Sequence, residues 1–186
     1  MLCSQYLLGD RGFVEDCLVV EMGAGTGVLG MVCRRLGARR VVLTDNDEVS
    51  LRHMSADAAR NGFSVEEVCV AALDWFGSSA EQCVAEEGGG GAPLLRVVAG
   101  DVLYKGVLLE PFMKTARRLL SAGRGGEMLL CHVPRAGVTH DSVAQAAVAA
   151  GLVLLEVPPE SWRKGAVLAH CPEEDVQSAK LYRICT

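Results

Sequence analysis

Four acidic residues of this chain stand where apolar runs end. They are Glu21, Asp45, Asp74 and Asp101, and a glycine-rich stretch over residues 23–30 follows the first of them. Ionised carboxylates accept hydrogen bonds from hydroxyl and amine groups and attract cations. If each apolar run is a strand of one parallel sheet, all four acids lie near the carboxyl ends of strands, where such sheets bind ligands. We therefore expect them to surround a single ligand site.

The segment LVVEMGAGTGVLG at 18–30 predicts a buried strand, a tight turn and the start of a helix. Gly23, Gly25 and Gly27 have no Cβ, so the backbone there bends sharply and a ligand approaches it closely. The first N–H groups of the following helix favour a negative group on that ligand. Residues 25–30 also satisfy G-x-G-x-x-G, so a nicotinamide dinucleotide is one alternative. A tight turn without any ligand is another.

Glu21 helps to choose between these ligands. A carboxylate two residues before the first glycine suits a ligand that carries an ammonium group, whereas it repels a pyrophosphate. S-adenosylmethionine has an ammonium group, a carboxylate for the end of the helix and no phosphate. The sequence therefore favours S-adenosylmethionine over a dinucleotide.

Two further segments are candidates for binding a nucleoside. Asp45 directly follows an apolar run, where an acid accepts two hydrogen bonds from a ribose diol. Its alternative role is to cap the next helix, although Asn46 or Asp47 can do that. Asp74 and Trp75 follow the third run, so one is expected to bind an adenine amine and the other to pack against the ring. Ordinary core packing is the competing interpretation for Trp75.

The pattern of elements predicts an α/β fold with a doubly wound, mostly parallel seven-stranded sheet and one antiparallel strand. The last two strands have no convincing helix between them, which allows a hairpin. The first expected strand begins at residue 18, and the other six span 40–44, 66–72, 94–99, 125–133, 152–157 and 180–185. Expected helices span about 2–9, 26–36, 47–61, 105–121 and 141–150.

Composition narrows the class of protein. The chain has 186 residues, half of them hydrophobic, and a net charge of −5. Residues 1–186 are expected to form one domain, with a flexible glycine-rich loop at 84–92. No apolar run is long enough for a membrane span, and the scattered basic residues argue against nucleic acid. Eight cysteines without metal spacing predict free thiols, a cytoplasmic location and no metal.

The segments EMGAGTG at 21–27, LTD at 43–45, LDW at 73–75 and DVLY at 101–104 together resemble the seven-β-strand methyltransferases. Within that class they are most similar to the protein-lysine methyltransferases, the group that includes the enzymes acting on calmodulin and on valosin-containing protein. The resemblance covers roughly residues 4–157 and implies a Rossmann-like fold with S-adenosyl-L-methionine as the cofactor. It implies a cofactor site formed by Glu21, Gly23, Ala24, Gly25, Gly27, Asp45, Asn46, Asp74, Trp75 and Gly100.

The resemblance also implies that Asp101 and Tyr104 are catalytic and line the entrance for a target lysine. Methyl transfer by direct in-line displacement needs alignment and exclusion of water, but no covalent intermediate. Asp101 and Tyr104 are placed to orient the amine, and the Tyr104 ring also offers a face to a cation. Their alternative roles are a helix N-cap for Asp101 and core packing for Tyr104. His132 and Arg135 are placed to border the entrance, although an ordinary loop role is favoured.

Two features depart from the family pattern. Relatives carry a further N-terminal segment with a tryptophan near the cofactor, whereas this chain starts inside the helix that contains SQYLL. We therefore expect part of the usual N-terminal segment to be lacking. Arg96 stands where relatives have an acidic residue.

The expected partner is a protein carrying the target lysine, with no nucleic acid and no membrane, and the chain is expected to be a monomer. Two other functions stay open. They are a small-molecule N- or O-methyltransferase and a catalytically silent, cofactor-binding interaction module.

Overall fold

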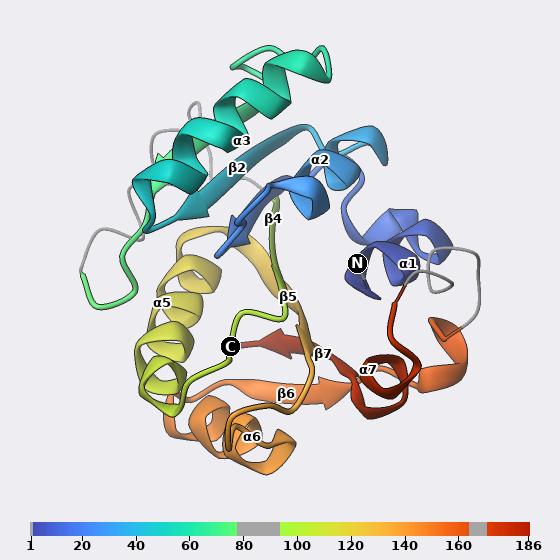
Figure 1. Ribbon diagram of the computed structural model, residues 1–186, viewed down its shortest axis with the longest axis vertical. Coiled ribbons are helices and arrows are strands. Elements are labelled where there is room, and N and C mark those ends of the chain that lie inside the picture. Colours follow the sequence, from blue (N-terminus) through green and yellow to red (C-terminus); the bar gives the residue numbers. More distant parts are fainter. Residues whose placement is uncertain (1, 78–93, 164–170) are drawn as a thin grey trace.

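The computed structural model describes residues 2–77, 94–163 and 171–186, and in these the strands form one sheet (Figure 1). The sheet has seven strands in the order β3-β2-β1-β4-β5-β7-β6. All neighbouring strands are parallel except at β7, which is antiparallel to both β5 and β6. The strands are β1 (Leu18–Met22), β2 (Arg40–Asp45), β3 (Val68–Ala72), β4 (Leu94–Gly100), β5 (Arg124–His132), β6 (Val153–Glu156) and β7 (Lys180–Cys185).

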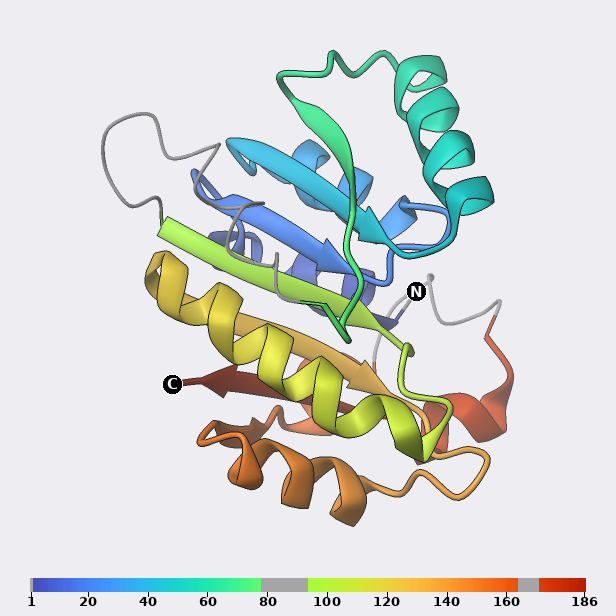
Figure 2. The ribbon, with the colours of Figure 1, turned by 90° about the vertical axis from the view of Figure 1, so that its left-hand side faces the viewer.

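Helices cover both faces of the sheet. On one face lie α1 (Leu2–Gly9), α2 (Val28–Arg35) and α3 (Glu48–Arg60), and on the other lie α5 (Leu109–Ala122) and α6 (His140–Ala149). Figure 2 shows α5 and α6 in front of the sheet, with α1 and α2 behind it. The remaining elements are η1 (Arg11–Phe13), η2 (Gly106–Leu108), η3 (Pro159–Ser161) and α7 (Glu173–Ser178).

This layering explains the apolar runs of the sequence. Every residue of β1 is buried, because helices cover the sheet on both sides. Val19 packs into the core under α1 and α2, while Leu18 and Val20 pack into the core under α5. A strand buried on both faces needs no polar alternation, which is why residues 18–20 are uninterrupted aliphatic side chains.

The predicted fold class is confirmed, with two local differences. The link between β6 and β7 contains η3 and α7, so these strands are antiparallel without forming a simple hairpin. The acidic helix α7 has six residues and no fully buried side chain, and it therefore lacks the periodic apolar face that predicts a helix. The helix predicted from residue 105 begins instead as the 3-10 turn η2 and becomes α-helical only at Leu109.

The other compositional expectations concern surface segments and thiols. The predicted glycine-rich loop at 84–92 and Cys83 lie outside the described residues. None of the other seven cysteines forms a disulfide among the described residues, and four of them, Cys3, Cys17, Cys33 and Cys131, are buried in the core. Over the described ranges, no helix is long and apolar enough to cross a membrane.

Candidate functional site

A cavity of about 470 Å³ opens at the carboxyl ends of the central strands. This volume lies within the range of about 300–1,000 Å³ typical of small-molecule sites. Nine of the predicted site residues line it: Gly23, Gly25, Asp45, Asn46, Asp74, Trp75, Gly100, Asp101 and Tyr104. Six residues that the sequence did not single out as site residues also line it: Asp47, Ser50, Leu73, Phe76, Val102 and Leu108. Most of these six are adjacent in the chain to a predicted residue, and this adjacency is the sequence signal that could have identified them.

The glycine loop forms one wall of this cavity. Gly25 has φ +55°, and a Cβ added there would meet no atom within 4 Å, so its bare Cα leaves open space at the wall. Gly23, at φ +66°, has a different reason to be glycine. A Cβ there would lie 2.9 Å from Val102 and 3.1 Å from the Trp75 ring. Gly23 therefore lets two other wall residues approach the loop closely.

Ala24 and Gly27 shape the loop from behind and do not line the cavity. The Ala24 N–H donates to the Thr44 carbonyl at 2.8 Å, and the Gly27 N–H donates to the Ala24 carbonyl at 2.8 Å. Gly27 is the N-cap of α2 with φ +72°, and a Cβ there would lie 2.7 Å from Leu43. Both residues therefore fix where α2 begins. Their direct contact with a cofactor stays a prediction.

Glu21 is buried behind the wall and does not line the cavity either. Its Oε2 accepts the N–H of Gly30, on the first turn of α2, at 2.7 Å. Burial raises the pKa of Glu21 to about 8, and the Gly30 N–H works against that rise. In this structure Glu21 therefore ties β1 to α2. The predicted contact with the ligand's ammonium group stays a prediction.

Replacing Glu21 by Gln should make the stability of the protein less dependent on pH. With a pKa near 8 in place of 4.5, the folded protein binds more protons than the unfolded chain between these values. The parent must therefore lose stability as the pH rises through this window. Gln keeps an acceptor for Gly30 but does not ionise. The free energy of unfolding is measured with denaturant at pH 5 and at pH 8. Between these two pH values it should fall by at least about 1 kcal/mol more in the parent than in the variant. Equal losses would show that burial does not hold Glu21 protonated.

Asp45 is oriented by three backbone amides. Its Oδ2 accepts the Gly25 N–H at 2.9 Å, and its Oδ1 accepts the N–H groups of Asn46 and Asp47 at 2.8 and 3.1 Å. A carboxylate offers about four acceptor sites, so at least one is left for a ligand. The N-cap of α3 is Asp47, which accepts the Ser50 N–H at 2.7 Å. The alternative role of Asp45 as the helix cap is therefore taken by Asp47, as the sequence allowed.

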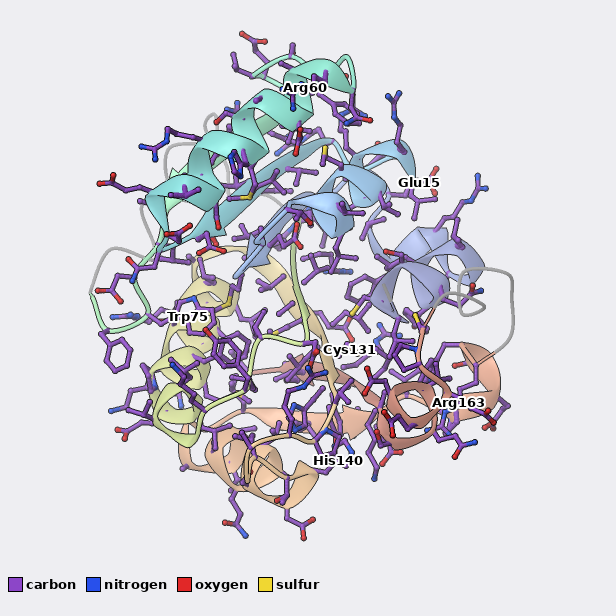
Figure 3. All side chains as sticks on the ribbon, in the orientation of Figure 1. Glu15, Arg60, Trp75, Cys131, His140 and Arg163 are labelled. Carbon is purple, nitrogen blue, oxygen red and sulfur yellow. The ribbon has the colours of Figure 1, made fainter. Side chains whose placement is uncertain are left out.

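Asp74 and Trp75 lie together in the turn after β3. Asp74 is exposed, and its Oδ1 accepts the Phe76 N–H at 2.9 Å, which fixes the turn. Trp75 is half-buried and lies beside α5 (Figure 3). Its ring meets that of Phe112 edge to face, with 5.0 Å between the two ring centroids. Trp75 thus packs against the core and lines the cavity at once. The two interpretations of this residue do not exclude each other.

Asp101 and Tyr104 follow β4 and line the same cavity. Asp101 has φ +59°, a conformation that non-glycine residues rarely adopt and that is concentrated at functional sites. It caps no helix, because η2 and α5 begin several residues later with Lys105 and Leu108 at their N-caps. Tyr104 is 49% exposed and so is not a core residue. The alternative structural roles of both residues are therefore wrong.

The structure adds one residue to this site that sequence reasoning assigned to an ordinary loop. Arg135, in the loop between β5 and α6, forms an ion pair with Asp101, with 2.6 Å between Nη2 and Oδ2. Burial raises the pKa of Asp101, while Arg135 and the Val133 N–H lower it. Only the adjacency of β4 and β5 brings these two residues together, so no local pattern pointed to the pair. The described residues contain no group of three His, Cys, Asp or Glu that could hold a metal ion.

Comparison with known proteins gives a family and several relatives. A family model described as lysine methyltransferase matches residues 3–143. The protein-lysine N-methyltransferase EFM3 of Chaetomium thermophilum is 26% identical over 161 residues, which are 86% of this chain and 47% of that protein. The ribosomal protein L11 methyltransferase of Myxococcus xanthus is 32% identical over 105 residues, 56% of this chain and 32% of that protein. The chain thus spans half or less of the length of these relatives.

Solved structures show the same fold at low sequence identity. A TehB-like SAM-dependent methyltransferase from Corynebacterium glutamicum superposes with a TM-score of 0.66 at 15% identity, covering 98% of this chain and 87% of that one. Magnesium protoporphyrin IX methyltransferase from Synechocystis, solved with bound SAM, superposes with a TM-score of 0.64 at 14% identity, covering 98% of this chain and 75% of that one. At these identities the likeness extends to the fold alone.

Proposed function

The chain belongs to the lysine methyltransferase family, and from this membership we propose that it is an S-adenosylmethionine-dependent methyltransferase acting on a lysine amine of a protein. Two relatives support a protein as the substrate, because they are named as a protein-lysine and a protein N-terminal and lysine methyltransferase. We further propose that the chain is one methyltransferase domain and works as a cytoplasmic monomer without nucleic acid or membrane.

The residues of the cavity fit the cofactor. The open Cα of Gly25 and the unused acceptor of Asp45 suit a ligand that lies against the backbone and offers a ribose diol. Asp74 is exposed beside the Trp75 ring, a combination that suits an adenine with an exocyclic amine. When bound, S-adenosylmethionine supplies a methyl group on a sulfonium that is already activated. The residues of the chain then have to hold it, orient the amine and exclude water.

One observation carries the assignment of methyl transfer to this cavity. Asp101 and Tyr104 are open to the same cavity as the glycine loop, and the structure gives neither of them the cap or core role that would otherwise explain it. An amine that enters beside Asp101 meets a carboxylate acceptor and the exposed ring of Tyr104. Both groups orient an amine, and an aromatic face also tolerates a positive charge. We assign them to positioning the amine for in-line transfer.

Titration calorimetry should show binding of S-adenosylmethionine and of its demethylated product, S-adenosylhomocysteine. NAD should give no binding heat at the same concentrations, because methyl transfer in the lysine methyltransferase family needs S-adenosylmethionine and not a dinucleotide. The expected dissociation constants are micromolar or tighter, corresponding to about 8 kcal/mol or more. Binding of NAD in place of S-adenosylmethionine would reject the proposal and restore the dinucleotide interpretation of residues 25–30.

A further inference from the structure

The ion pair between Arg135 and Asp101 holds a guanidinium, which is always positively charged, directly against the proposed catalytic carboxylate. The side chains are 43% and 33% exposed, so the pair lies at the edge of the cavity and not in the core. Arg135 engages Oδ2, whereas Oδ1 is buried without a hydrogen-bond partner among the described residues. Because Oδ1 has almost no accessible surface, a ligand reaches the carboxylate of Asp101 at Oδ2, beside Arg135.

The backbone around Arg135 is fixed by buried groups. The segment between Cys131 and His140, both labelled in Figure 3, contains a tight turn with positive φ at Ala136 and Gly137. The turn is closed by the Val138 N–H, which donates to the Arg135 carbonyl at 2.9 Å. Val138 is itself buried in the core. Arg135 thus points from an anchored turn rather than from a free loop.

His132 anchors the same turn from the end of β5. It is fully buried, and its Nε2 lies 3.3 Å from the Val138 carbonyl, so that nitrogen must carry the proton. Burial, and then the neighbouring His140, lower the pKa of His132 to about 4. The imidazole is therefore neutral at physiological pH, and it donates to the turn. The backbone of Asp101 is also attached to β5, because the Asp101 N–H donates to the Cys131 carbonyl at 3.0 Å.

A carboxylate by itself is a poor partner for a lysine that must react as a neutral amine. A lysine with its ordinary pKa of about 10.4 is neutral in only about one molecule in 2,500 at pH 7. An unpaired carboxylate within about 4–6 Å raises the pKa of an amine further, by about 1–3 units. A carboxylate that is already paired with a guanidinium accepts a hydrogen bond without this penalty.

We propose that Arg135 is a positioning residue that keeps Asp101 oriented and the acceptor pair electrically neutral, so that the target amine is held unprotonated. This inference rests on the proposed function and specifies how its site treats the substrate. The amine gives its proton to water, and Asp101 accepts a hydrogen bond from a remaining N–H. Among the described residues, Asp175 from α7 also acts on Asp101, and because it is acidic it opposes Arg135. The Cys131 thiol on β5 is also close but is held neutral by the Cys3 side chain and by burial.

The test compares Arg135→Gln and Arg135→Lys with the parent in transfer of labelled methyl groups from S-adenosylmethionine to a cell lysate. Initial rates are measured from pH 6.5 to pH 10. For Arg135→Gln we expect the rate at pH 7.5 to fall about 10-fold and the midpoint of the pH profile to rise by about one unit. Arg135→Lys keeps the charge and should retain most of the parent's rate and midpoint. Arg60→Gln, which removes another exposed arginine–aspartate pair far from the cavity, is the control.

Two results would overturn the proposal. A faster Arg135→Gln enzyme would mean that Arg135 blocks the amine's place on Asp101. A rate that falls equally at every pH would mean that Arg135 only supports the turn.

A second measurement does not depend on turnover. In carbon-13 NMR titrations, the pKa of the Asp101 carboxyl should be higher in Arg135→Gln than in the parent, and close to the parent's in Arg60→Gln. An unchanged pKa of Asp101 would reject the neutral pair even if the parent protein methylates no lysate protein. Failure of the parent to bind S-adenosylmethionine would instead reject the proposed function and leave this result standing.

Discussion

Replacing Asp101 by Asn is expected to lower methyl transfer by ~10²-fold or more, with the affinity for S-adenosylmethionine nearly unchanged. Asn keeps the size of the side chain but loses the charge that pairs with Arg135 and one of its acceptor oxygens. The effect falls on alignment and proton handling of the amine, and losses of this size are typical for such groups. The measurements are calorimetry with the cofactor and labelling of a lysate on the same preparations.

Tyr104→Ala extends the same test to the other side of the amine. Because the Tyr104 side chain is exposed and is not part of the core, Tyr104→Ala should not lower the melting temperature appreciably. Val107→Ala, another exposed side chain in the segment after β4, provides a matched control that should keep its activity. Full activity in both Asp101→Asn and Tyr104→Ala would sink their catalytic assignment. An inactive parent that still binds the cofactor would favour a silent cofactor-binding module.

Asp45→Ala should weaken binding of S-adenosylmethionine by roughly 1.5–3 kcal/mol, or about 10- to 150-fold. The structure gives two reasons. The carboxylate is the proposed acceptor for the ribose, and it also holds the Gly25 N–H and the two amides at the start of α3. Its loss therefore removes a ligand contact and loosens two walls of the cavity together. Calorimetry of the folded variant measures the effect.

Asp45→Asn separates these two contributions. Asn retains a carbonyl oxygen for the amides, so most of the local structure should remain while the charge-assisted contact with the ribose is lost. Asp57→Ala, which removes an exposed aspartate from α3 and its ion pair with Arg60, is the control for loss of charge alone. Unchanged affinity in a folded Asp45→Ala protein would reject the ribose role.

The sequence was most informative where the signal is local. An uninterrupted aliphatic run marks a strand that is covered on both faces, and β1 is such a strand. Glycines at 23, 25 and 27 mark backbone with positive φ, and all three adopt it. Because these properties depend on a few adjacent residues, the order of the elements, the sheet class and the position of the cavity were predictable.

Contacts between distant segments were not predictable in the same way. Glu21 was interpreted as a ligand group, but its environment depends on α2 folding back so that Gly30 donates to it. Arg135 was assigned to an ordinary loop, because nothing near it in the chain reveals that β4 and β5 are neighbours. The start of α5 was misplaced because the helical pattern extends back to about residue 105, whereas Lys105 is extended and residues 106–108 fold as a 3-10 turn.

The sequence by itself therefore determined the α/β class, the glycine turn and the three acids Asp45, Asp74 and Asp101 that line the cavity, since periodicity and turn chemistry depend on neighbouring residues. The tertiary structure alone decided how each acid is used. Asp45 is oriented by three amides, Glu21 is buried against α2, and Asp101 is paired with an arginine. The physical reason is that charge state and orientation depend on burial and on the nearest partner, and both are set by which strands become neighbours.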